Sequence, residues 1–254
     1  MFRTIDLNAD LGEGIGDSGR HEDEELLGTV SSANIACGFH AGDAATMRRT
    51  VRFARDHDVA LGAHPSYPDR PGFGRRELGL SAREIEHHVR YQIRALSDMC
   101  GSEGAALLYV KPHGALYNRA ARDPEAARAI VRSIRAENPA LRLLGLPSSE
   151  LSKAAETHSV RYANEAFVDR AYTSDGRLAP RTYPDAVIHD VDAAVARAMA
   201  MVADGTVVAT DGTELRIEAH SLCVHGDNPA AGSILRRLRA RLEKSGVRIA
   251  PFAA

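Results

Sequence analysis

Short apolar runs of strand length alternate along this chain with longer segments whose apolar residues recur at helical spacing. Such an alternation is typical of strand–helix units built around a parallel sheet. Seven strands are predicted, at residues 4–8, 32–36, 58–63, 106–111, 141–146, 161–167 and 221–225. Units in this number either close as a barrel or lie open as a doubly wound sheet, and the pattern leaves both open.

Helix start signals lie between these runs. Ser81 and Glu84 form a capping box, and Asp123 places a cap residue before Pro124 at the first helical position. No linker or shift of composition divides the chain, so residues 1–254 are expected to form one domain. Further helices are predicted at 22–27, 46–57, 149–157, 190–202 and 230–244, and an Asp-Gly turn predicts a small inserted β-hairpin near 206–218.

Composition excludes several classes of protein. Apolar residues make up 44% of the chain and charged residues 26%, as in ordinary globular proteins. A formal net charge of -2 lacks the basic surplus of nucleic-acid-binding proteins and gives no reason to expect an anionic membrane as partner. No signal peptide or membrane-spanning run is found, and the three cysteines form no C-x-x-C pair, which together favour a reducing, cytoplasmic location.

Four of the 11 histidines follow predicted strands directly. In either architecture, the loops after the carboxyl ends of the strands build the functional face. Imidazoles on that face can act as general base, donate hydrogen bonds to an oxyanion or bind a metal. The other seven histidines are interpreted as surface residues, and the four at strand ends are His40, His64, His113 and His225.

Charged side chains gather on the same loops. Lys111, one of only three lysines, follows an apolar run, which suggests either an ammonium that binds a carboxylate or phosphate, or a strand-end ion pair. Asp10 and Asp43 are equally consistent with turn formation and helix capping. Residues 69–76 carry three arginines and are expected to fold over an anion as a lid or to contact another protein.

The evidence for a nucleotide site in the sequence is poor. Residues 14–19 match G-x-G-x-x-G, but the acidic segment 21–25 follows, which disfavours a pyrophosphate there. The P-loop pattern is absent. Any use of ATP therefore needs another site or a partner chain.

Five segments in order resemble the LamB/YcsF family, and the resemblance runs from Asp6 to about Asn228. It implies an α/β fold, an irregular seven-stranded, TIM-like (β/α) barrel of the glycoside hydrolase/deacetylase type. It also implies the A component of an ATP-dependent 5-oxoprolinase, a hydrolase that converts 5-oxo-L-proline to L-glutamate together with B and C subunits. The five segments are 8–13 (NADLGE), 34–43 (NIACGFHAGD), 62–69 (GAHPSYPD), 111–118 (KPHGALYN) and 224–227 (VHGD).

For that reaction, Asp10 or His40 is expected to be the general base. His64 and His113 are expected to stabilise negative charge, and Lys111 to bind the substrate carboxylate or a phosphate. ATP is expected to be handled with the partner subunits, and self-association stays open. The residues expected to bind substrate are Asn8, Glu13, Asp43, Arg70, Arg75, Tyr117, Asn118, Arg170, His225 and Asp227.

Other functions stay open. A metal-dependent amide hydrolase or deacetylase would use Asp10, His40 and His64 as ligands of a divalent metal, by fold analogy, although the compact H-x-x-x-H spacing of deacetylases is absent. A non-catalytic component would instead present 5-oxoproline to its partners, and the missing P-loop favours this alternative. Cys37 lies near His40 in the sequence, which would permit a nucleophilic role, although all three cysteines are interpreted first as structural.

Overall fold

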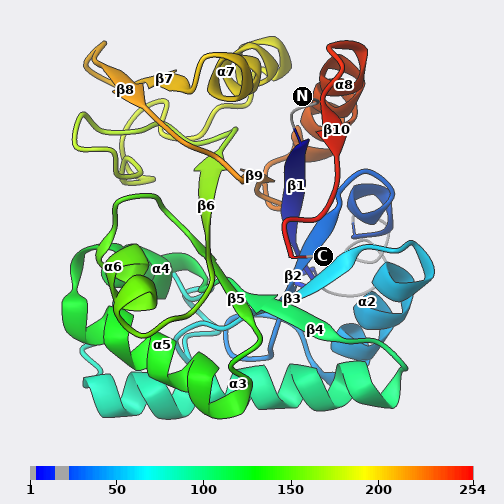
Figure 1. Cartoon of the computed structure of the whole chain (residues 1–254), viewed down its shortest axis with the longest axis vertical. Helices are drawn as coiled ribbons and strands as arrows, with labels where there is room; N and C mark the ends of the chain where they lie inside the picture. The colour runs from blue at the N-terminus through cyan, green and yellow to red at the C-terminus, as the bar shows by residue number, and fades with distance from the viewer. Residues whose placement is uncertain (1–3, 15–22, 254) are drawn as a thin grey trace.

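A computed structural model describes residues 4–14 and 23–253 of the chain. Within these residues, seven parallel strands pair in the order of the chain, and β9 pairs with both β6 and β1, which closes the sheet into a barrel (Figure 1). The predicted barrel is therefore confirmed and the open sheet is excluded. The strands are β1 (Thr4–Leu11), β2 (Ser32–Ala36), β3 (Ala60–His64), β4 (Leu107–Val110), β5 (Arg142–Gly145), β6 (Tyr162–Phe167) and β9 (Ser221–Val224).

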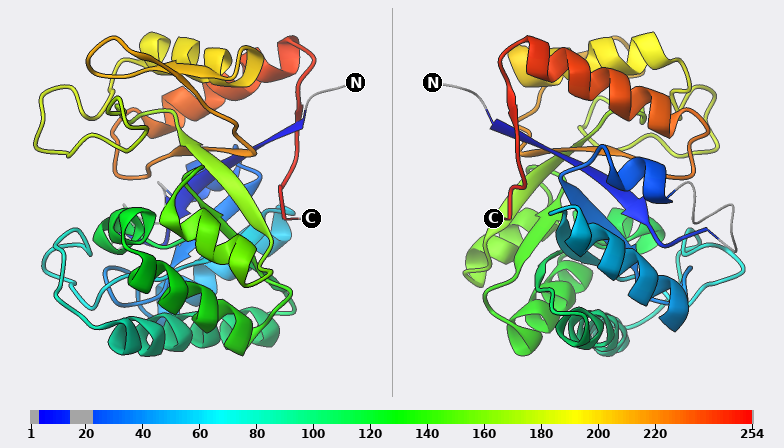
Figure 2. Two further views of the ribbon diagram at one scale, coloured as in Figure 1. Left: turned by 60° about the vertical axis from the view of Figure 1, so that its left-hand side comes forward. Right: turned by 90° about the vertical axis from the view of Figure 1, so that its right-hand side faces the viewer.

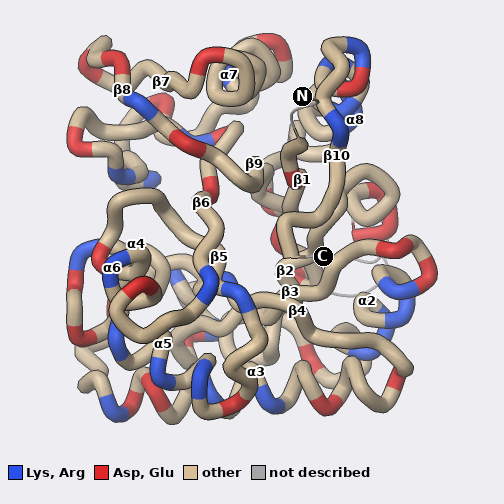
Figure 3. Tube along the Cα trace, viewed as in Figure 1, with Lys and Arg blue, Asp and Glu red and all other residues tan. Residues whose placement is uncertain are grey.

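Helices surround the barrel (Figure 2). Residues 23–27 are also helical, whereas residue 22 of the predicted first helix lies outside the described residues. Acidic and basic residues are interspersed along the outer helices, in keeping with the small net charge (Figure 3). The helices are α2 (Ala44–Asp56), α3 (Ala82–Ser102), α4 (Gly114–Arg122), α5 (Pro124–Glu137), α6 (Glu150–Thr157), α7 (Val191–Ala203) and α8 (Ala231–Lys244).

Local start signals explain which helices the sequence predicts. The Ser81 hydroxyl accepts from the backbone of Glu84 in a complete capping box, and Asp123 caps α5 directly before Pro124. Helix α4 was not predicted, because its N-cap residue, His113, makes no side-chain cap hydrogen bond. A helix without a cap residue carries no start signal in the sequence.

In the described part of the chain, three short strands lie outside the barrel. The predicted hairpin is present as β7 (Thr206–Val208) and β8 (Glu214–Arg216), which pair antiparallel. A two-residue strand, β10 (Arg248–Ile249), adds to the first residues of β1. Two residues are too few to show a strand pattern, so β10 was not predicted.

The core forms where the outer face of the barrel meets the helices. Alternate residues of β1, such as Leu7 and Ala9, are fully buried in this apolar layer, whereas Asn8 and Asp10 point into the barrel. At the amino end of the barrel, Phe252 packs against Tyr109 and closes the floor. Among the described residues, the helices are all too short or too polar to cross a bilayer.

Candidate active site at the carboxyl end of the barrel

A cavity of about 500 Å³ opens at the carboxyl end of the strands. Its walls come from the loops after β3, β4, β6 and β9, so the predicted functional face holds the cavity. The charged and polar residues that line it include Asp10, His64, Arg75, Lys111, His113, Tyr117, Asn118, Arg170, Arg181 and His225.

A buried ammonium between two carboxylates forms the base of the cavity. Lys111 Nζ lies 3.0 Å from Asp10 Oδ1 and makes an ion pair of 2.8 Å with Glu165 Oε1. Burial by itself lowers the pKa of a lysine, but Asp10 and its other anionic neighbours hold the pKa of Lys111 well above its ordinary value. Burial likewise raises the pKa of Asp10, yet His64 and Lys111 bring it well below the usual range. Lys111 and Asp10 therefore stay charged.

Amide and hydroxyl groups extend this network into the barrel. Asn34 Nδ2 donates to Asp10 Oδ1 at 2.8 Å, and Tyr109 donates to Asn34 Oδ1 at 2.8 Å. Asn8 accepts from Asn34 Nδ2 and lies 3.2 Å from Lys111 Nζ, while its own amide donates to Ser221. Asn8 thus holds Asn34 and Lys111 in place and does not line the cavity.

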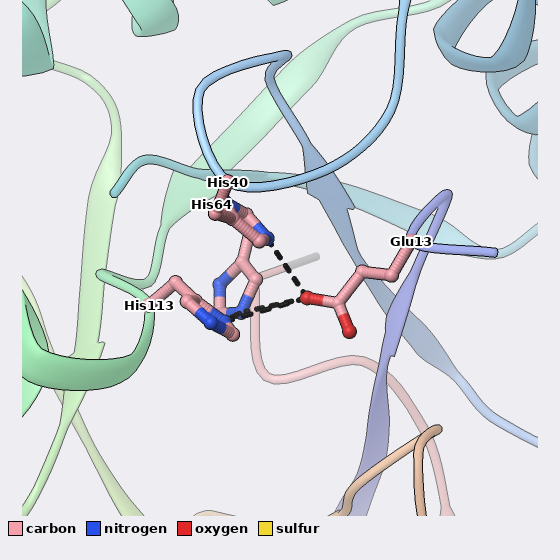
Figure 4. Close-up of side chains that lie close together, drawn as sticks. All are labelled: Glu13, His40, His64 and His113. Atoms are coloured by element: carbon pink, nitrogen blue, oxygen red, sulfur yellow. Dashed lines mark hydrogen bonds and ion pairs between the residues drawn. The ribbon is translucent and has the colours of Figure 1, made fainter. Parts of the chain in front are cut away.

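Three imidazoles and a carboxylate converge beside the cavity (Figure 4). His40 Nε2 lies 2.9 Å from Glu13 Oε1, and His64 Nε2 lies 2.9 Å from His113 Nδ1. His40, His64 and His113 are each less than 5% exposed. Gly74 makes room for this cluster, because a Cβ at that position would lie 2.9 Å from atoms of His40 and His113.

A carboxylate–imidazole pair stands on the β9 side of the cavity. Asp169 Oδ1 lies 2.9 Å from His225 Nδ1, and Asp169 Oδ2 accepts from the amide of Asn228 at 3.1 Å. Burial opposes the charge of Asp169, but His225 and these hydrogen bonds lower the pKa of the carboxyl group below its ordinary value. An ionised Asp169 accepts the Nδ1 proton of His225 and leaves Nε2 for the cavity.

Arginines form the rim of the cavity. Arg75 and Arg181 both contact the carboxylate of Asp227, at 2.7 and 3.3 Å. Arg170 is buried and donates to the carbonyls of Ala179 and Ala186, which ties down the loop after β6. Burial and the nearby Arg181 lower the pKa of Arg170 to about 10.

Some residues predicted to bind substrate lie elsewhere. Asp43 caps α2 by accepting from Thr46 N, and Arg70 donates to the carbonyls of Gly38 and Gly42. Neither lines the cavity. The segment 69–76 packs on the histidine cluster and is braced internally by Asp69, which accepts from Arg76. Of the glycine-rich segment 14–19, residues 15–19 lie outside the described part of the chain.

The cysteines retain the structural interpretation. Burial raises the pKa of Cys37 to about 12 and the pKa of Cys223 well above its ordinary value, so both remain thiols at neutral pH. Cys37 is not placed to act as a nucleophile, because the cavity lining does not include it.

Sequence reasoning did not select Glu165 or Arg181 as site residues, and it placed Asp169 among the carboxylates of the functional face without giving it a role. Glu165 lies in β6 two residues before Phe167, so the two-residue alternation of a strand would have placed both on one face. Asp169 follows the same strand, which places it on the functional face, and its contact with His225 gives it a role. Arg181 lies in an irregular loop without any pattern that marks it.

A family model described as LamB/YcsF family matches residues 5–254. The chain belongs to the LamB/YcsF family. A LamB/YcsF relative from Symbiobacterium thermophilum, named as the A subunit of 5-oxoprolinase, is 49% identical over 247 residues, 97% of this chain and 95% of the relative. The crystal structure of a lactam utilization protein from Thermus thermophilus matches with a TM-score of 0.91 and 46% identity, over 98% of this chain and all of that one.

A more distant structural similarity, to a deacetylase, concerns the fold alone. The catalytic domain of a peptidoglycan N-acetylglucosamine deacetylase from Eubacterium rectale matches with a TM-score of 0.53 at 8% identity, over 99% of this chain and 89% of that one. The deacetylase-type barrel expected from the resemblance is therefore confirmed as a fold.

Proposed function

We propose that this chain is the A subunit of an ATP-dependent 5-oxoprolinase and opens the lactam ring of 5-oxo-L-proline to give L-glutamate. The observation that carries the proposal is the full-length similarity, at 49% identity, to relatives named as the A subunit of 5-oxoprolinase. Because the sequence has no P-loop, ATP is handled with the B and C partner subunits.

The lactam is an unactivated amide, which accounts for the need for ATP. Transfer of the terminal phosphoryl group of ATP to the lactam oxygen forms an O–P bond, releases ADP and makes the ring carbon electrophilic. Water adds to that carbon, the ring C–N bond breaks as the nitrogen gains a proton, and γ-glutamyl phosphate results. A second water then releases phosphate and leaves glutamate, so that two waters are consumed in total.

His225 is the general base and acid of the ring opening in this proposal. Asp169 fixes its Nδ1 proton, so Nε2 takes a proton from water as the oxygen attacks and returns a proton to the departing nitrogen. The expected bases, Asp10 and His40, serve less well. His40 Nε2 is occupied by Glu13, and the lowered pKa of Asp10 makes that carboxylate a weak base suited to orienting water.

The charged groups around the cavity fit an anionic substrate. Lys111 is already engaged by Asp10 and Glu165, so its role is to keep Asp10 ionised and to hold both side chains in place. Arg75 and Arg181, which hold the carboxylate of Asp227 at the rim, are the groups that receive the substrate carboxylate or the phosphate.

The test is glutamate formation from 5-oxoproline and ATP by the chain reconstituted with its partner subunits. His225→Gln should lower kcat at least about 100-fold, the lower range for loss of a general base. His87→Gln, on the exposed face of α3, is the matched control and should leave kcat unchanged. Full turnover in the His225 variant would remove that residue from the mechanism. A wild-type complex that forms no glutamate would reject the function itself.

A further inference from the structure

Two buried imidazoles of the histidine cluster point ring nitrogens at each other. Carbonyl oxygens only accept hydrogen bonds, so His64 Nδ1 donates to Lys111 O at 2.8 Å and His113 Nε2 donates to Phe73 O at 2.9 Å. If both imidazoles are neutral, each carries one N–H, and the opposite nitrogens, His64 Nε2 and His113 Nδ1, are then both bare. These two nitrogens lie 2.9 Å apart. Such an arrangement requires a cation that both nitrogens contact, either a shared proton or a metal ion.

Glu13 and His40 complete a set of four donors. Glu13 Oε1 lies 2.9 Å from His40 Nε2, 3.4 Å from His113 Nδ1 and 4.0 Å from His64 Nε2. A tetrahedral ion with bonds of about 2.0–2.1 Å holds its ligand atoms about 3.3 Å apart. The distances between donor atoms in this cluster, which run from 2.9 to 4.0 Å, include values below and above 3.3 Å. The rings of His40 and His113 stack with centroids 3.9 Å apart, so one ring must turn slightly for both nitrogens to reach the same ion.

The surroundings keep these imidazoles in the form that a metal binds. Metal binding needs a lone pair on each imidazole, and the carbonyl hydrogen bonds of His64 and His113 occupy only the nitrogen that faces away from the cluster. The carbonyl bonds to the far nitrogens of His64 and His113 are of the kind that orient metal-ligating histidines. Three imidazoles and one carboxylate suit zinc or a similar transition metal better than magnesium or calcium, which prefer oxygen ligands.

We propose that Glu13, His40, His64 and His113 bind one divalent transition-metal ion of the zinc or cobalt class beside the cavity. This set differs from the Asp10, His40 and His64 triad suggested by fold analogy. Glu13 supplies the carboxylate and His113 joins, while Asp10 lies 3.4 Å from His64 Nε2 and is held by Lys111. Binding requires neither substrate nor partner subunits, so the inference goes beyond the proposed function and does not depend on it.

The test uses the full chain, stripped of metal with a chelator and freed of any affinity tag, and titrated with Co²⁺ and then Zn²⁺. We expect one Co²⁺ per chain, with the visible absorption of a four-coordinate ion, and its displacement by Zn²⁺. Glu13→Gln and His113→Gln should each weaken Co²⁺ binding more than about tenfold, since even outer partners of metal ligands contribute that much. His225→Gln is the matched control in the same cavity and should bind like the wild type.

Circular dichroism establishes that each variant is folded before its affinity is compared. The proposal is overturned if no stoichiometric binding occurs and nitrogen NMR shows a proton shared by His64 and His113. It is equally overturned if binding survives in the Glu13 and His113 variants, or if His225→Gln abolishes it. The last result would place the ion on Asp10, Cys223 and His225, whose donor atoms also lie within 4.8 Å of one another. Glutamate formation does not enter this readout, so the two proposals fail separately.

Discussion

Hydrogen bonds and ion pairs of individual residues allow the interior of the barrel to contain several charged side chains. The sequence places Asp6, Asn8 and Asp10 on one face if the first strand extends that far, and β1 does extend to Leu11. Each of the three side chains finds partners on neighbouring strands, so none is left without a hydrogen bond or ion pair. The alternation is readable in the sequence, whereas the partners are not, because they come from strands far along the chain.

Asp6 gives a prediction for the pH dependence of stability. Burial raises its pKa to about 6, although the hydroxyls of Ser31, Ser32 and Ser221 donate to the carboxylate. A carboxyl group with a raised folded pKa favours the fold below its unfolded pKa, near 4, and this contribution is lost as the pH rises through about 6. Asp6→Asn should therefore gain stability relative to the wild type between pH 4 and 7, by on the order of 3 kcal/mol.

Urea unfolding at each pH measures this difference. Asp175→Asn, which changes a carboxylate on an exposed turn, is the control, and its difference from the wild type should not rise over that interval. A constant difference between Asp6→Asn and the wild type from pH 4 to 7 would show that Asp6 titrates normally.

The pair formed by Asp169 and His225 gives a prediction for activity. In Asp169→Asn the amide group can donate to Nδ1, which reverses the proton placement on His225 and removes the lone pair from Nε2. We expect kcat in the reconstituted complex to fall at least about 100-fold with little change in KM. Asp192→Asn, whose carboxylate pairs with Arg237 on the outer surface, should retain wild-type kcat. Equal turnover by both variants would contradict the role of Asp169.

Among the elements, β3 and β4 show what a sequence pattern reveals and what it misses. Both strands were predicted within about two residues, because their apolar runs are clear. The sequence pattern did not predict the register shift between Leu61 and Gly62 or the position of the Tyr109 ring over Gly62. Space for a ring from the next strand is a property of the pair and cannot be read from either strand alone.

Gly62 therefore gives a prediction about this pair of strands. A Cβ at position 62 would overlap the Tyr109 ring, so Gly62→Ala should destabilise the protein by about 2 kcal/mol or more. Gly101→Ala in α3 is the control, because a Cβ there meets open space, and it should be neutral or stabilising by up to about 1 kcal/mol. Chemical unfolding at constant pH measures both. Similar stabilities for the two variants would show that Tyr109 moves aside without cost.

At the scale of the whole molecule, the floor of the barrel connects to the site at its other end. Phe252 packs edge-on against Tyr109, with ring centroids 4.9 Å apart. Tyr109 donates to Asn34, and Asn34 donates to Asp10. A segment near the end of the chain thus supports a carboxylate at the base of the cavity.

Phe252→Ala should lower the free energy of unfolding by about 1–2 kcal/mol, less than for a fully buried phenylalanine because the ring is only partly buried. Tyr183→Ala, at an exposed aromatic residue, should change stability by less than about 0.5 kcal/mol. Denaturant titration compares the two variants. If the Phe252 variant unfolds like the wild type, the terminal segment does not support the floor.

The candidate site likewise contains residues that the sequence predicted and residues that it did not. His64, Lys111, His113 and His225 were predicted because each follows a strand, and parallel strands bring their carboxyl ends to one face. Glu165 was not selected and the pairing of Asp169 with His225 was not predicted, because both depend on the closed barrel, which brings β6 beside β9 and Lys111 beside Glu165. Sequence position thus predicts which end of the barrel holds the cavity, whereas the pairing of charges depends on the closed structure.

The pairing of β1 with β9 has a consequence for how the chain is made. Asn8 and its partner Ser221 are 213 residues apart, so at roughly 5–20 residues per second the first strand waits about 10–40 s for its second neighbour. During that interval the edge of β1 that later pairs with β9 has no partner strand, while synthesis of the chain continues on the ribosome. The charged and amide side chains on alternate positions of β1 discourage pairing with foreign strands. The same residues that equip the finished barrel therefore protect the nascent chain from aggregation.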